Sequence, residues 1–466
     1  MILSKSKEMI LKMKIDENIK PNIFRGYDIR GIYGEELTED VAYTIGKSYG
    51  TYIQNVKNKK VAIVGYDNRS SSVPLSKALI QGMVETGLDV INIGLVTTPM
   101  FYYSWLLFNV PSGIMITASH NPKEYNGFKM AFDEFGNACG EMIQDFRKHT
   151  ANLDFIAGNG TERKEDITEK YLELLQKSIN LGDKKIKVVV DAANGTASIV
   201  AKKAFELIGA EVIPIYCDSN PDFPNHHPDP CVEANNADLK KAVLANKADL
   251  GIGLDGDGDR VGVIDENGKM IFIDEFMIII WRNIMSKVTN KNALFDIKCS
   301  KSLPDEILKL GGTPVFYRTG NSYMKAKMKE GKFAFGGELS GHVFFADKFP
   351  GFDDGIYAGM RLIEILSNTD KKLSEHLDGI NKYYSTPEIK YKSTDDKKFG
   401  IIDGVRKYCE EKGYNIITLD GVRAEFKDGW ALVRASNTGP DITMRFEGKT
   451  QERMKEIQEE FTALLP

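Results

Sequence analysis

Several signals of disulfide, metal and membrane chemistry are missing from this chain of 466 residues. Its five cysteines are scattered and none forms a C-x-x-C pair, so a disulfide framework and a structural zinc site are not expected. No apolar run approaches the roughly 20 residues that a membrane helix needs. Lysines interrupt every apolar run near the N-terminus, which excludes a signal-peptide core. We therefore expect a cytoplasmic protein with reduced cysteines and no membrane partner.

Nucleotide-binding loops and a basic surface charge are absent as well. The GKS and GKT tripeptides at 46–48 and 448–450 lack the upstream glycine of a P-loop, with Val41 and Thr443 in its place. No G-x-G-x-x-G opens a helix after a strand. A formal net charge of −5 provides no footprint for nucleic acid. ATP- or NAD-dependent chemistry and a nucleic-acid partner are therefore not expected.

What the chain does contain is a pattern that occurs three times. A short apolar run is followed by a polar turn, a helix-period segment, a glycine and a second apolar run, beginning at Val61, Val188 and Ala293. Each copy predicts a strand, a helix and a parallel strand. The spacing of about 100 residues indicates three similar α/β domains, since solenoid repeats are much shorter. From about Tyr383 onward, short strands and a final helix predict a smaller α+β domain.

The predicted fold class is therefore α/β, with three similar mixed-sheet α/β domains plus a C-terminal α+β domain around a central cleft. The predicted domains span residues 1–165, 166–269, 270–381 and 382–466. Binding clefts commonly form where domains meet, so we expect the functional residues there.

Three aspartates at alternate positions, Asp255, Asp257 and Asp259, stand in GLDGDGDRVGV between two apolar runs. The runs predict strands, with a tight acidic loop between them. In extended backbone alternate residues face one side, so the three carboxylates are expected to converge on one hard cation. Three oxygen ligands with open positions for phosphate or water fit Mg²⁺.

Three other interpretations of these aspartates stay open. An EF-hand would use them together with Glu266, but Arg260 replaces its essential glycine and the flanks resemble strands. A phosphatase of the haloacid dehalogenase type would use Asp257 as nucleophile, although that family places a strand directly before this residue. A solvated acidic turn is the third interpretation, because glycine is common in turns.

The motif TASHNP, residues 117–122, offers a nucleophile. Ser119 can act as one when a neighbour activates it, although the G-x-S-x-G elbow of hydrolases is absent. His120 is adjacent in sequence and does not by itself complete a triad. A turn in which Ser119 caps a helix is the alternative. Lys129 follows downstream, where it can reach the same pocket.

Two further motifs carry side chains suited to sugars and phosphates. In GGELSGH, Glu338 and Ser340 can bind sugar hydroxyls, and His342 can act as an acid or a base near neutral pH. In RASNTGP, Arg434 stands with serine, asparagine and threonine, which together make a phosphate cradle or a plain surface turn.

These four motifs, in this order and at these spacings, resemble those of the α-D-phosphohexomutase superfamily. FRGYDIRG at residues 24–31 and FPNHHPDP at residues 223–230 are similar to its phosphomannomutase/phosphoglucomutase branch. The resemblance runs from about Ile23 to the C-terminus. It implies a four-domain enzyme with a deep cleft, to which the first three domains each contribute a loop. The fourth domain would close on the substrate phosphate.

The resemblance implies an intramolecular phosphotransferase that interconverts hexose 1-phosphate and hexose 6-phosphate, with mannose, glucose or both as the sugar. Ser119 would carry a phosphoryl group, and Mg²⁺ would bridge it to the three aspartates. Transfer to the free hydroxyl would give a 1,6-bisphosphate, which turns around and returns its other phosphoryl group to Ser119. Glucose 1,6-bisphosphate or mannose 1,6-bisphosphate is the implied activator.

The functional residues of the family carry over to matching positions of this sequence. The implied catalytic residues are Ser119, Arg30, Lys129 and His342. The implied metal ligands are Ser119, Asp255, Asp257 and Asp259. The implied substrate-binding residues are Tyr27, His120, Arg260, Lys298, Thr319, Glu338, Ser340, Arg434, Ser436, Asn437 and Thr438.

Two positions depart from the family pattern. Asn321 stands where bacterial relatives often have histidine, which puts an acid or base role of this position in doubt. Leu339 stands where this branch usually has methionine and the phosphoglucosamine branch glutamine, and it cannot hydrogen-bond an amino sugar. A phosphoglucosamine mutase, a magnesium-dependent sugar phosphatase and a calcium-stabilised binding protein stay as alternatives. We expect a hexose phosphate as partner and a monomer or homodimer as assembly.

Overall fold

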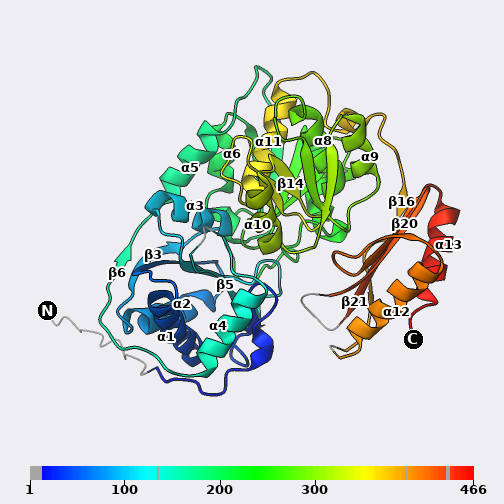
Figure 1. The fold of residues 1–466 in the computed structure, drawn as a ribbon. Coiled ribbons are helices and arrows are strands. Elements are labelled where there is room, and N and C mark those ends of the chain that lie inside the picture. The colour runs from blue at the N-terminus through cyan, green and yellow to red at the C-terminus, as the bar shows by residue number, and fades with distance from the viewer. Residues whose placement is uncertain (1–12, 134–135, 395, 437–440) are drawn as a thin grey trace.

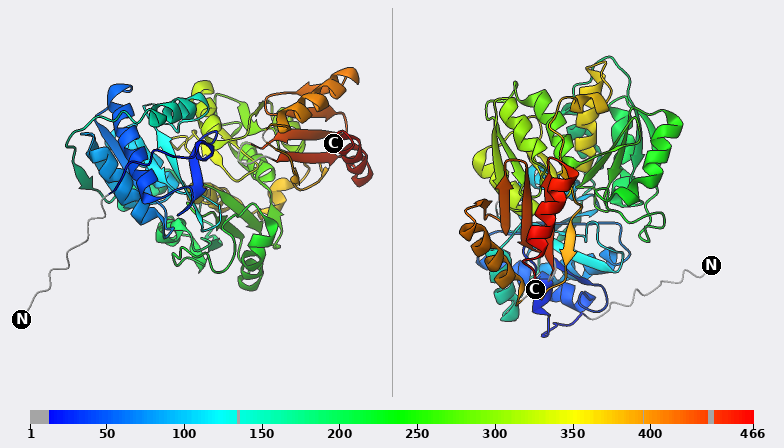
Figure 2. Two further views of the ribbon diagram at one scale, coloured as in Figure 1. Left: turned by 90° about the horizontal axis from the view of Figure 1, so that it is seen from below. Right: turned by 90° about the vertical axis from the view of Figure 1, so that its right-hand side faces the viewer.

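The computed structural model describes residues 13–133, 136–394, 396–436 and 441–466. These residues form four sheets in chain order, each covered by helices (Figure 1). Among them, no helix combines the length and the apolar character that crossing a membrane requires. The C-terminal sheet and its two helices stand to one side of the other three sheets (Figure 2).

The first domain is built on a six-stranded sheet with the order β1-β5-β4-β2-β3-β6. Its elements are β1 (Ile29–Ile32), α1 (Glu39–Asn55), β2 (Val61–Tyr66), α2 (Ser72–Val84), β3 (Asp89–Leu95), α3 (Thr98–Phe108), β4 (Gly113–Ile116), β5 (Tyr125–Ala131), α4 (Glu141–Ala151) and β6 (Glu162–Lys164). Strand β2 pairs in parallel with β3 and β4, whereas β5 is antiparallel to β4 and β1.

The second domain has five strands in the order β11-β10-β9-β7-β8. Its elements are α5 (Thr168–Lys177), β7 (Lys187–Asp191), α6 (Ala201–Leu207), β8 (Glu211–Ile215), α7 (Ala237–Asn246), β9 (Leu250–Leu254), β10 (Val261–Asp265) and β11 (Met270–Ile271). Strand β7 is parallel to β8 and β9, and β10 is antiparallel to β9.

The third domain has four strands in the order β13-β12-β14-β15. Its elements are α8 (Ile273–Ile284), β12 (Asn292–Asp296), α9 (Ser302–Lys309), β13 (Thr313–Tyr317), α10 (Asn321–Gly331), β14 (Phe335–Gly337), β15 (Val343–Phe345) and α11 (Gly355–Ser367). Strand β12 is parallel to β13 and β14, and β15 is antiparallel to β14.

These three sheets share one topology. The orders β5-β4-β2-β3, β10-β9-β7-β8 and β15-β14-β12-β13 are equivalent, and each ends in an antiparallel hairpin. The three hairpin connections carry TASHNP, DGDGDR and GELSGH. The repeated sequence pattern therefore predicts three copies of one unit, and each copy places its chemical motif in the same connection.

The fourth domain is an antiparallel sheet with the order β16-β21-β20-β19-β18, and β17 also pairs with β21. Its elements are β16 (Tyr384–Ser385), β17 (Ile389–Tyr391), α12 (Lys398–Glu411), β18 (Asn415–Ile417), β19 (Val422–Phe426), β20 (Gly429–Ala435), β21 (Ile442–Gly448) and α13 (Gln451–Thr462). The segment NKYYSTPEI, residues 381–389, contributes β16 and the start of β17. The predicted fold class is confirmed.

One continuous cluster of buried apolar side chains, from Ile63 to Leu377, joins the first three domains. The fourth domain has its own core. It contacts the third domain through several bonds, among them the hydrogen bonds that Arg423 donates to the carbonyl oxygens of Ile297 and Cys299, at 2.6 and 2.8 Å. The first three domains therefore form one body, and the fourth is joined to the end of β12.

Candidate active site

The aspartate loop, residues 255–260, is a tight turn between β9 and β10. The expectation of extended backbone is wrong, because Gly258 adopts a φ of 81°, which only glycine tolerates well. The carboxylates of Asp255, Asp257 and Asp259 nevertheless converge, each offering one oxygen within 4.8 Å of the others, and all three residues are fully buried. The turn, and not strand alternation, brings them together. Strands on both sides exclude the EF-hand.

The Ser119 loop, residues 117–124, connects β4 to β5 and meets the aspartate loop. The Ser119 hydroxyl donates a hydrogen bond to Asp255 Oδ2 at 2.8 Å. Ser119 itself has a φ of 50°, a left-handed conformation that costs a residue with a side chain about 1 to 3 kcal/mol. Thr117 Oγ1 accepts its N–H at 2.9 Å and donates to Asp257 Oδ2 at 3.0 Å. The nucleophile and the acidic turn are thus in direct contact.

A lysine from the neighbouring strand supplies fixed positive charge to this cluster. Lys129 Nζ lies 2.9 Å from Asp257 Oδ2 and 2.6 Å from Asp259 Oδ2. Burial works to lower the pKa of Lys129, but the two carboxylates outweigh it and hold the pKa well above its usual value. Burial and the other two aspartates raise the pKa of Asp255 well above its usual value.

The aspartate loop fits a divalent metal ion. Asp257 Oδ1 and Asp259 Oδ1 are buried and have no hydrogen-bond partner among the described residues, although buried carboxylate oxygens are normally paired. Oxygen donors of this kind are the ligands that Mg²⁺ prefers. Asp259 also lies near His342 and Asp353, a second group with suitable ligand atoms.

Two predicted side chains approach Ser119 from the first domain. Arg30 on β1 donates a hydrogen bond to Asn121 Oδ1 at 2.8 Å, within the Ser119 loop, and pairs with Asp28 at 2.6 Å. His120 Nδ1 lies 3.5 Å from Ser119 Oγ. Burial, followed by the charges of nearby arginines, lowers the pKa of His120 well below its usual value, so this imidazole is neutral.

Two more predicted side chains, one from the second domain and one from the third, lie close to the aspartate loop. Arg260 Nε lies 3.7 Å from Asp255 Oδ2, and the carboxylate outweighs burial and raises the pKa of this arginine. His342 Nδ1 lies 2.8 Å from Asp353 Oδ2 and 3.6 Å from Asp259 Oδ1. His342 is therefore held by a buried carboxylate that the sequence interpretation did not single out.

The turn between β14 and β15 presents Glu338. Its Oε1 accepts the Gly320 N–H at 2.6 Å, while its Oε2 is buried with no hydrogen-bond partner among the described residues. Burial raises the pKa of Glu338 to about 7, although His342 works in the opposite direction. The unpaired oxygen is available to a ligand hydroxyl. Ser340 lies in the same turn.

The boundary between the third and fourth domains holds the remaining cations in pairs. Arg434, at the end of β20, lies 2.9 Å from Asp420 Oδ2. The same oxygen accepts the Thr319 N–H at 3.1 Å. Lys298 Nζ lies 2.8 Å from Glu388 of the fourth domain. These contacts place three predicted substrate-binding residues beside one another across the boundary.

The predicted residues thus fall into two groups. The first surrounds the aspartate loop and comprises Ser119, Arg30, His120, Lys129, Arg260, His342, Asp255, Asp257 and Asp259. The second lies at the third and fourth domains and comprises Lys298, Thr319, Glu338, Ser340, Arg434 and Ser436. Burial raises the pKa of Tyr27, and the charges of Arg30 from the first group and of Glu338 from the second also act on it. Asn437 and Thr438 lie outside the described residues.

Several residues that contact the predicted site residues escaped the sequence interpretation. Thr98, at the start of α3, donates to Asp257 Oδ2 at 2.6 Å. Arg69 contacts the Ser119 loop, Asp353 contacts His342, and Asp420 contacts Arg434. A sequence signal existed only for Asp353, in the acidic pair of FDDG.

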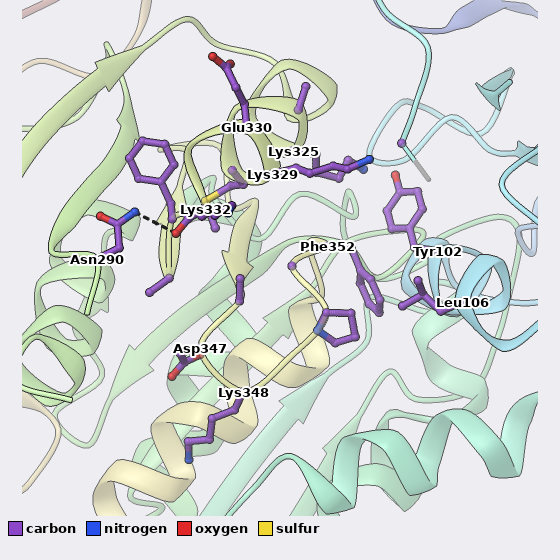
Figure 3. Close-up of a pocket in the computed structure, with 18 of the residues that line it drawn as sticks. Tyr102, Leu106, Asn290, Lys325, Lys329, Glu330, Lys332, Asp347, Lys348 and Phe352 are labelled. Carbon is purple, nitrogen blue, oxygen red and sulfur yellow. Dashed lines mark hydrogen bonds between the residues drawn. The ribbon is translucent and has the colours of Figure 1, made fainter. Parts of the chain in front are cut away.

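A separate cavity of about 1540 Å³ lies between the first and third domains, and none of the predicted site residues lines it. Figure 3 shows Lys325 extending toward Tyr102 at its wall, with Phe352 nearby. Lys325 Nζ lies 3.6 Å from the centre of the Tyr102 ring and 3.1 Å from Asp353 Oδ1. This lysine therefore connects the cavity wall to the carboxylate that holds His342.

Phosphoryl transfer depends on positioning and on charge neutralisation. The site provides both, because a serine hydroxyl faces three buried carboxylates and lies beside the fixed charges of a lysine and an arginine. Fold and site together define a multidomain phosphotransferase.

Comparison with known protein families shows the family to which this chain belongs. Four domain models described as phosphoglucomutase/phosphomannomutase match in chain order: α/β/α domain I at residues 21–156, domain II at 169–268, domain III at 273–383 and the C-terminal domain at 388–464. The chain belongs to the phosphoglucomutase/phosphomannomutase family.

Similar proteins span nearly the whole chain. A phosphomannomutase/phosphoglucomutase of Pseudomonas aeruginosa is 42% identical over 443 residues, covering 94% of each chain. A phosphoglucomutase of Neisseria meningitidis is 38% identical over 454 residues, covering 96% of this chain and 97% of the relative. The crystal structure of a family protein from Burkholderia thailandensis superposes with a TM-score of 0.89 at 35% identity, covering 97% of this chain and 98% of the other.

Proposed function

We propose that this enzyme interconverts the 1-phosphate and 6-phosphate of glucose, mannose or both, through a phosphoserine and a 1,6-bisphosphate. The observation that carries the proposal is the 2.8 Å contact between Ser119 Oγ and Asp255 within the buried carboxylate cluster. The range of sugars is supported by relatives that are named phosphomannomutase/phosphoglucomutase and phosphoglucomutase.

Ser119, Asp255, Asp257 and Asp259 would hold Mg²⁺, because their oxygens converge and two of them are unpaired. When bound, the ion neutralises phosphoryl charge and polarises the phosphoryl oxygens. Glucose 1,6-bisphosphate or mannose 1,6-bisphosphate is the proposed activator, since it can donate a phosphoryl group to an unmodified Ser119.

In the first transfer, the phosphoryl group moves from Ser119 Oγ to the free 6-hydroxyl of hexose 1-phosphate. The bond from phosphorus to Oγ breaks while the bond to the sugar oxygen forms. His342 accepts the hydroxyl proton, the departing Ser119 oxygen takes a proton from solvent water, and the balance is restored when His342 returns its proton to solvent. Lys129 and Arg30 stay cationic and balance the charge of the transferred group. The bisphosphate then turns, and the reverse transfer of its 1-phosphoryl group leaves hexose 6-phosphate.

The second group of residues would hold the sugar and the phosphate that does not react. Glu338 and Ser340 bind sugar hydroxyls, and the unpaired Glu338 Oε2 supports this role. The distal phosphate is bound by Arg434, Ser436, Asn437 and Thr438. The walls of the site are lined by Tyr27, His120, Arg260, Lys298 and Thr319.

The phosphatase alternative is disfavoured by the surroundings of Asp257. Its Oδ2 accepts hydrogen bonds from Thr98, Thr117 and Lys129, at 2.6, 3.0 and 2.9 Å. These bonds fix the side chain, and Asp257 lies three residues past Leu254, where β9 ends, whereas that phosphatase type places its nucleophile directly after a strand.

The proposal is tested by measuring kcat/KM on glucose 1-phosphate, mannose 1-phosphate and glucosamine 1-phosphate, together with the intact mass of the protein. We expect turnover of at least one neutral sugar and a Ser119 form heavier by one phosphoryl group. Glucosamine 1-phosphate should be slower by about tenfold, since Leu339 offers its amine no hydrogen bond. Release of inorganic phosphate without isomerisation would overturn the proposal.

Gly256 lets the aspartate loop approach the Ser119 loop. A Cβ at this position would lie 2.5 Å from the Ser119 carbonyl oxygen, so the loops must separate to accept a side chain. We expect Gly256→Ala to lower kcat by about 100-fold, because a displacement near 1 Å suffices for such a loss. Steady-state kinetics on the preferred sugar phosphate measures this.

Gly400→Ala is the matched control, because nothing lies within 4 Å of a Cβ at that helix position. We expect its kcat to stay within about twofold of the unmodified enzyme. Equal kcat values for the two variants would show that the close approach is not needed.

Glu338 predicts a pH dependence of substrate binding. With a pKa of about 7 it is protonated below that pH and ionised above it, and the ionised form accepts hydrogen bonds from sugar hydroxyls best. We expect kcat/KM to rise through about pH 7 and Glu338→Gln to remove this rise. The second ionisation of the substrate phosphate, near pH 6, affects both proteins equally. Parallel profiles of kcat/KM against pH in the two proteins would contradict the role.

The raised pKa of Glu338 also makes the stability of the folded protein depend on pH. Because folding raises the pKa of Glu338 above its usual value of 4.5, the folded state loses stability as pH rises from about 4.5 to 7. Glu338→Gln should show a smaller decrease across this window in thermal unfolding.

A further inference from the structure

Two consecutive residues between β2 and α2 join the Ser119 loop to the second domain. Asn68 reaches the second domain, and Arg69 reaches the Ser119 loop of the first. We propose that Asn68 and Arg69 form a clamp that positions the Ser119 loop against the aspartate loop across the boundary between the two domains. This inference rests on the proposed phosphoryl transfer and assigns the two residues a positioning role in it.

The guanidinium of Arg69 holds four carbonyl groups in and next to one loop. Its Nη2 donates to the carbonyl oxygens of Ser119 and Asn121, at 2.8 and 2.6 Å. Its Nη1 donates to those of Pro122 and Tyr125, at 2.6 and 3.1 Å. One rigid planar group therefore fixes the backbone on both sides of the turn, including that of the strained Ser119.

Arg69 is itself held in place by Asp67. Only 2% of the residue is exposed, and its Nε lies 3.2 Å from Asp67 Oδ2. Asp67 Oδ1 accepts the Arg69 N–H at 3.0 Å and the Ser72 hydroxyl at 2.5 Å. The carboxylate compensates the buried charge and leaves the two terminal nitrogens for the loop.

Asn68 makes the connection to the second domain. Its Nδ2 donates to the Asn194 carbonyl oxygen at 2.8 Å and to Ser219 Oγ at 3.0 Å. Its backbone N–H donates to Thr196 Oγ1 at 3.0 Å. The Thr196 N–H in turn donates to the carbonyl oxygen of Gly256 in the aspartate loop, at 2.8 Å. A short chain of bonds thus runs from Asn68 to the metal-binding turn.

The contacts of Arg69 and those of Asn68 end at two groups that touch each other in the proposed site. The Ser119 carbonyl that Arg69 holds is the group against which Gly256 packs, so both loops are fixed at their point of closest approach. A shift of the second domain against the Ser119 loop has to break bonds of Asn68 or Arg69. Phosphoryl transfer depends on alignment of the nucleophile with the charge that faces it, so the clamp acts on the transfer step and not on sugar binding.

Arg69→Lys tests the clamp, because lysine keeps the charge but cannot span four carbonyl groups. We expect kcat to fall by about 100-fold with KM for the sugar phosphate changed by less than about threefold. We also expect a smaller phosphorylated fraction of Ser119 by intact mass after incubation with glucose 1,6-bisphosphate. A purely structural role would lower the amount of folded enzyme, measured by circular dichroism, and leave kcat per folded molecule unchanged.

The matched control is Arg361→Lys. Arg361 is equally buried and pairs with Asp347 at 2.8 Å, within the third domain. We expect this variant to keep its kcat. If Arg69→Lys does not fold, Asn68→Ala carries the same test, since it removes the two bonds to Asn194 and Ser219 and leaves the guanidinium in place.

The outcomes separate the clamp from the proposed function. A fall in kcat at constant KM in Arg69→Lys or Asn68→Ala, with Arg361→Lys unaffected, supports the clamp. An unchanged kcat in the folded Arg69 or Asn68 variant overturns it, as does an equal loss in Arg361→Lys. An unmodified enzyme without mutase activity overturns the proposed function instead. In that case, an unchanged phosphorylated fraction of Ser119 in Arg69→Lys overturns the clamp as well.

Discussion

Replacing Ser119 with alanine is expected to lower kcat for hexose phosphate interconversion by at least about 10⁴-fold, because the transferred phosphoryl group loses its carrier. The hydroxyl is the group that faces Asp255 at 2.8 Å. Neighbouring side chains can bind a phosphate but cannot replace the covalent carrier. A coupled assay for hexose 6-phosphate measures the loss, and intact mass should show no phosphorylated form.

Ser104→Ala is the matched control for this experiment. Ser104 is also fully buried in the first domain, but its hydroxyl donates only to the Phe101 carbonyl oxygen of its own helix, at 2.6 Å. We expect this variant to keep kcat within about threefold of the unmodified enzyme. Full turnover by Ser119→Ala, or a phosphoryl group on another residue, would refute the phosphoserine mechanism.

Removing one carboxylate charge from the aspartate loop has the second largest expected effect. In Asp257→Asn the proposed metal site loses an anionic ligand, and an amide replaces the carboxylate whose Oδ2 Lys129, Thr98 and Thr117 bind. We expect kcat to fall by about 10³-fold at saturating Mg²⁺, since the charge that balances the phosphoryl group is displaced. We also expect the apparent dissociation constant for Mg²⁺ to rise by at least about tenfold. Activity is followed as a function of Mg²⁺ concentration.

Thermal unfolding gives a readout that does not depend on turnover. Mg²⁺ should raise the melting temperature of the unmodified enzyme, because a ligand that binds only the folded state stabilises it. This increase should be smaller in Asp257→Asn and unchanged in Asp265→Asn. Asp265 is a buried aspartate at the far end of the same hairpin, where it accepts two backbone N–H groups. An Asp257 variant with unaltered Mg²⁺ dependence would contradict the metal site.

Much of the fold was predictable because each of the first three domains repeats one local pattern. Apolar runs bounded by turns and a helix-period segment reveal β2-α2-β3 and its two counterparts without reference to distant contacts. The pairing of the strands was less visible. The strand after the aspartate loop was predicted, but its antiparallel pairing with β9 was not, and the segment that forms β16 and β17 depends on pairing with β21. Such pairing is set by tertiary structure.

The chemical motifs were predictable for a different reason. Residues such as Ser119, Asp257 and Glu338 stand in short loops where polar side chains and glycines gather. The residues that hold them were harder to predict, because Arg69 and Asp353 come from other loops and meet the site only after the domains pack, and only the acidic pair of FDDG pointed to Asp353. The aspartates show the limit clearly. Their alternation indicated the correct convergence, but a turn with a left-handed glycine produces it.

The paired cations at the fourth domain bear on how the intermediate turns around. Arg434 and Lys298 are each occupied by a carboxylate of that domain, Asp420 and Glu388. In the proposed function, the phosphate that Arg434 binds exchanges places with an internal anion, and the free energy it gains is only the difference between the two partners. The carboxylates also stand ready to take the cations back when the phosphate departs. For the proposed bisphosphate intermediate, this exchange lowers the free-energy cost of releasing one end, which helps the molecule turn around within the site.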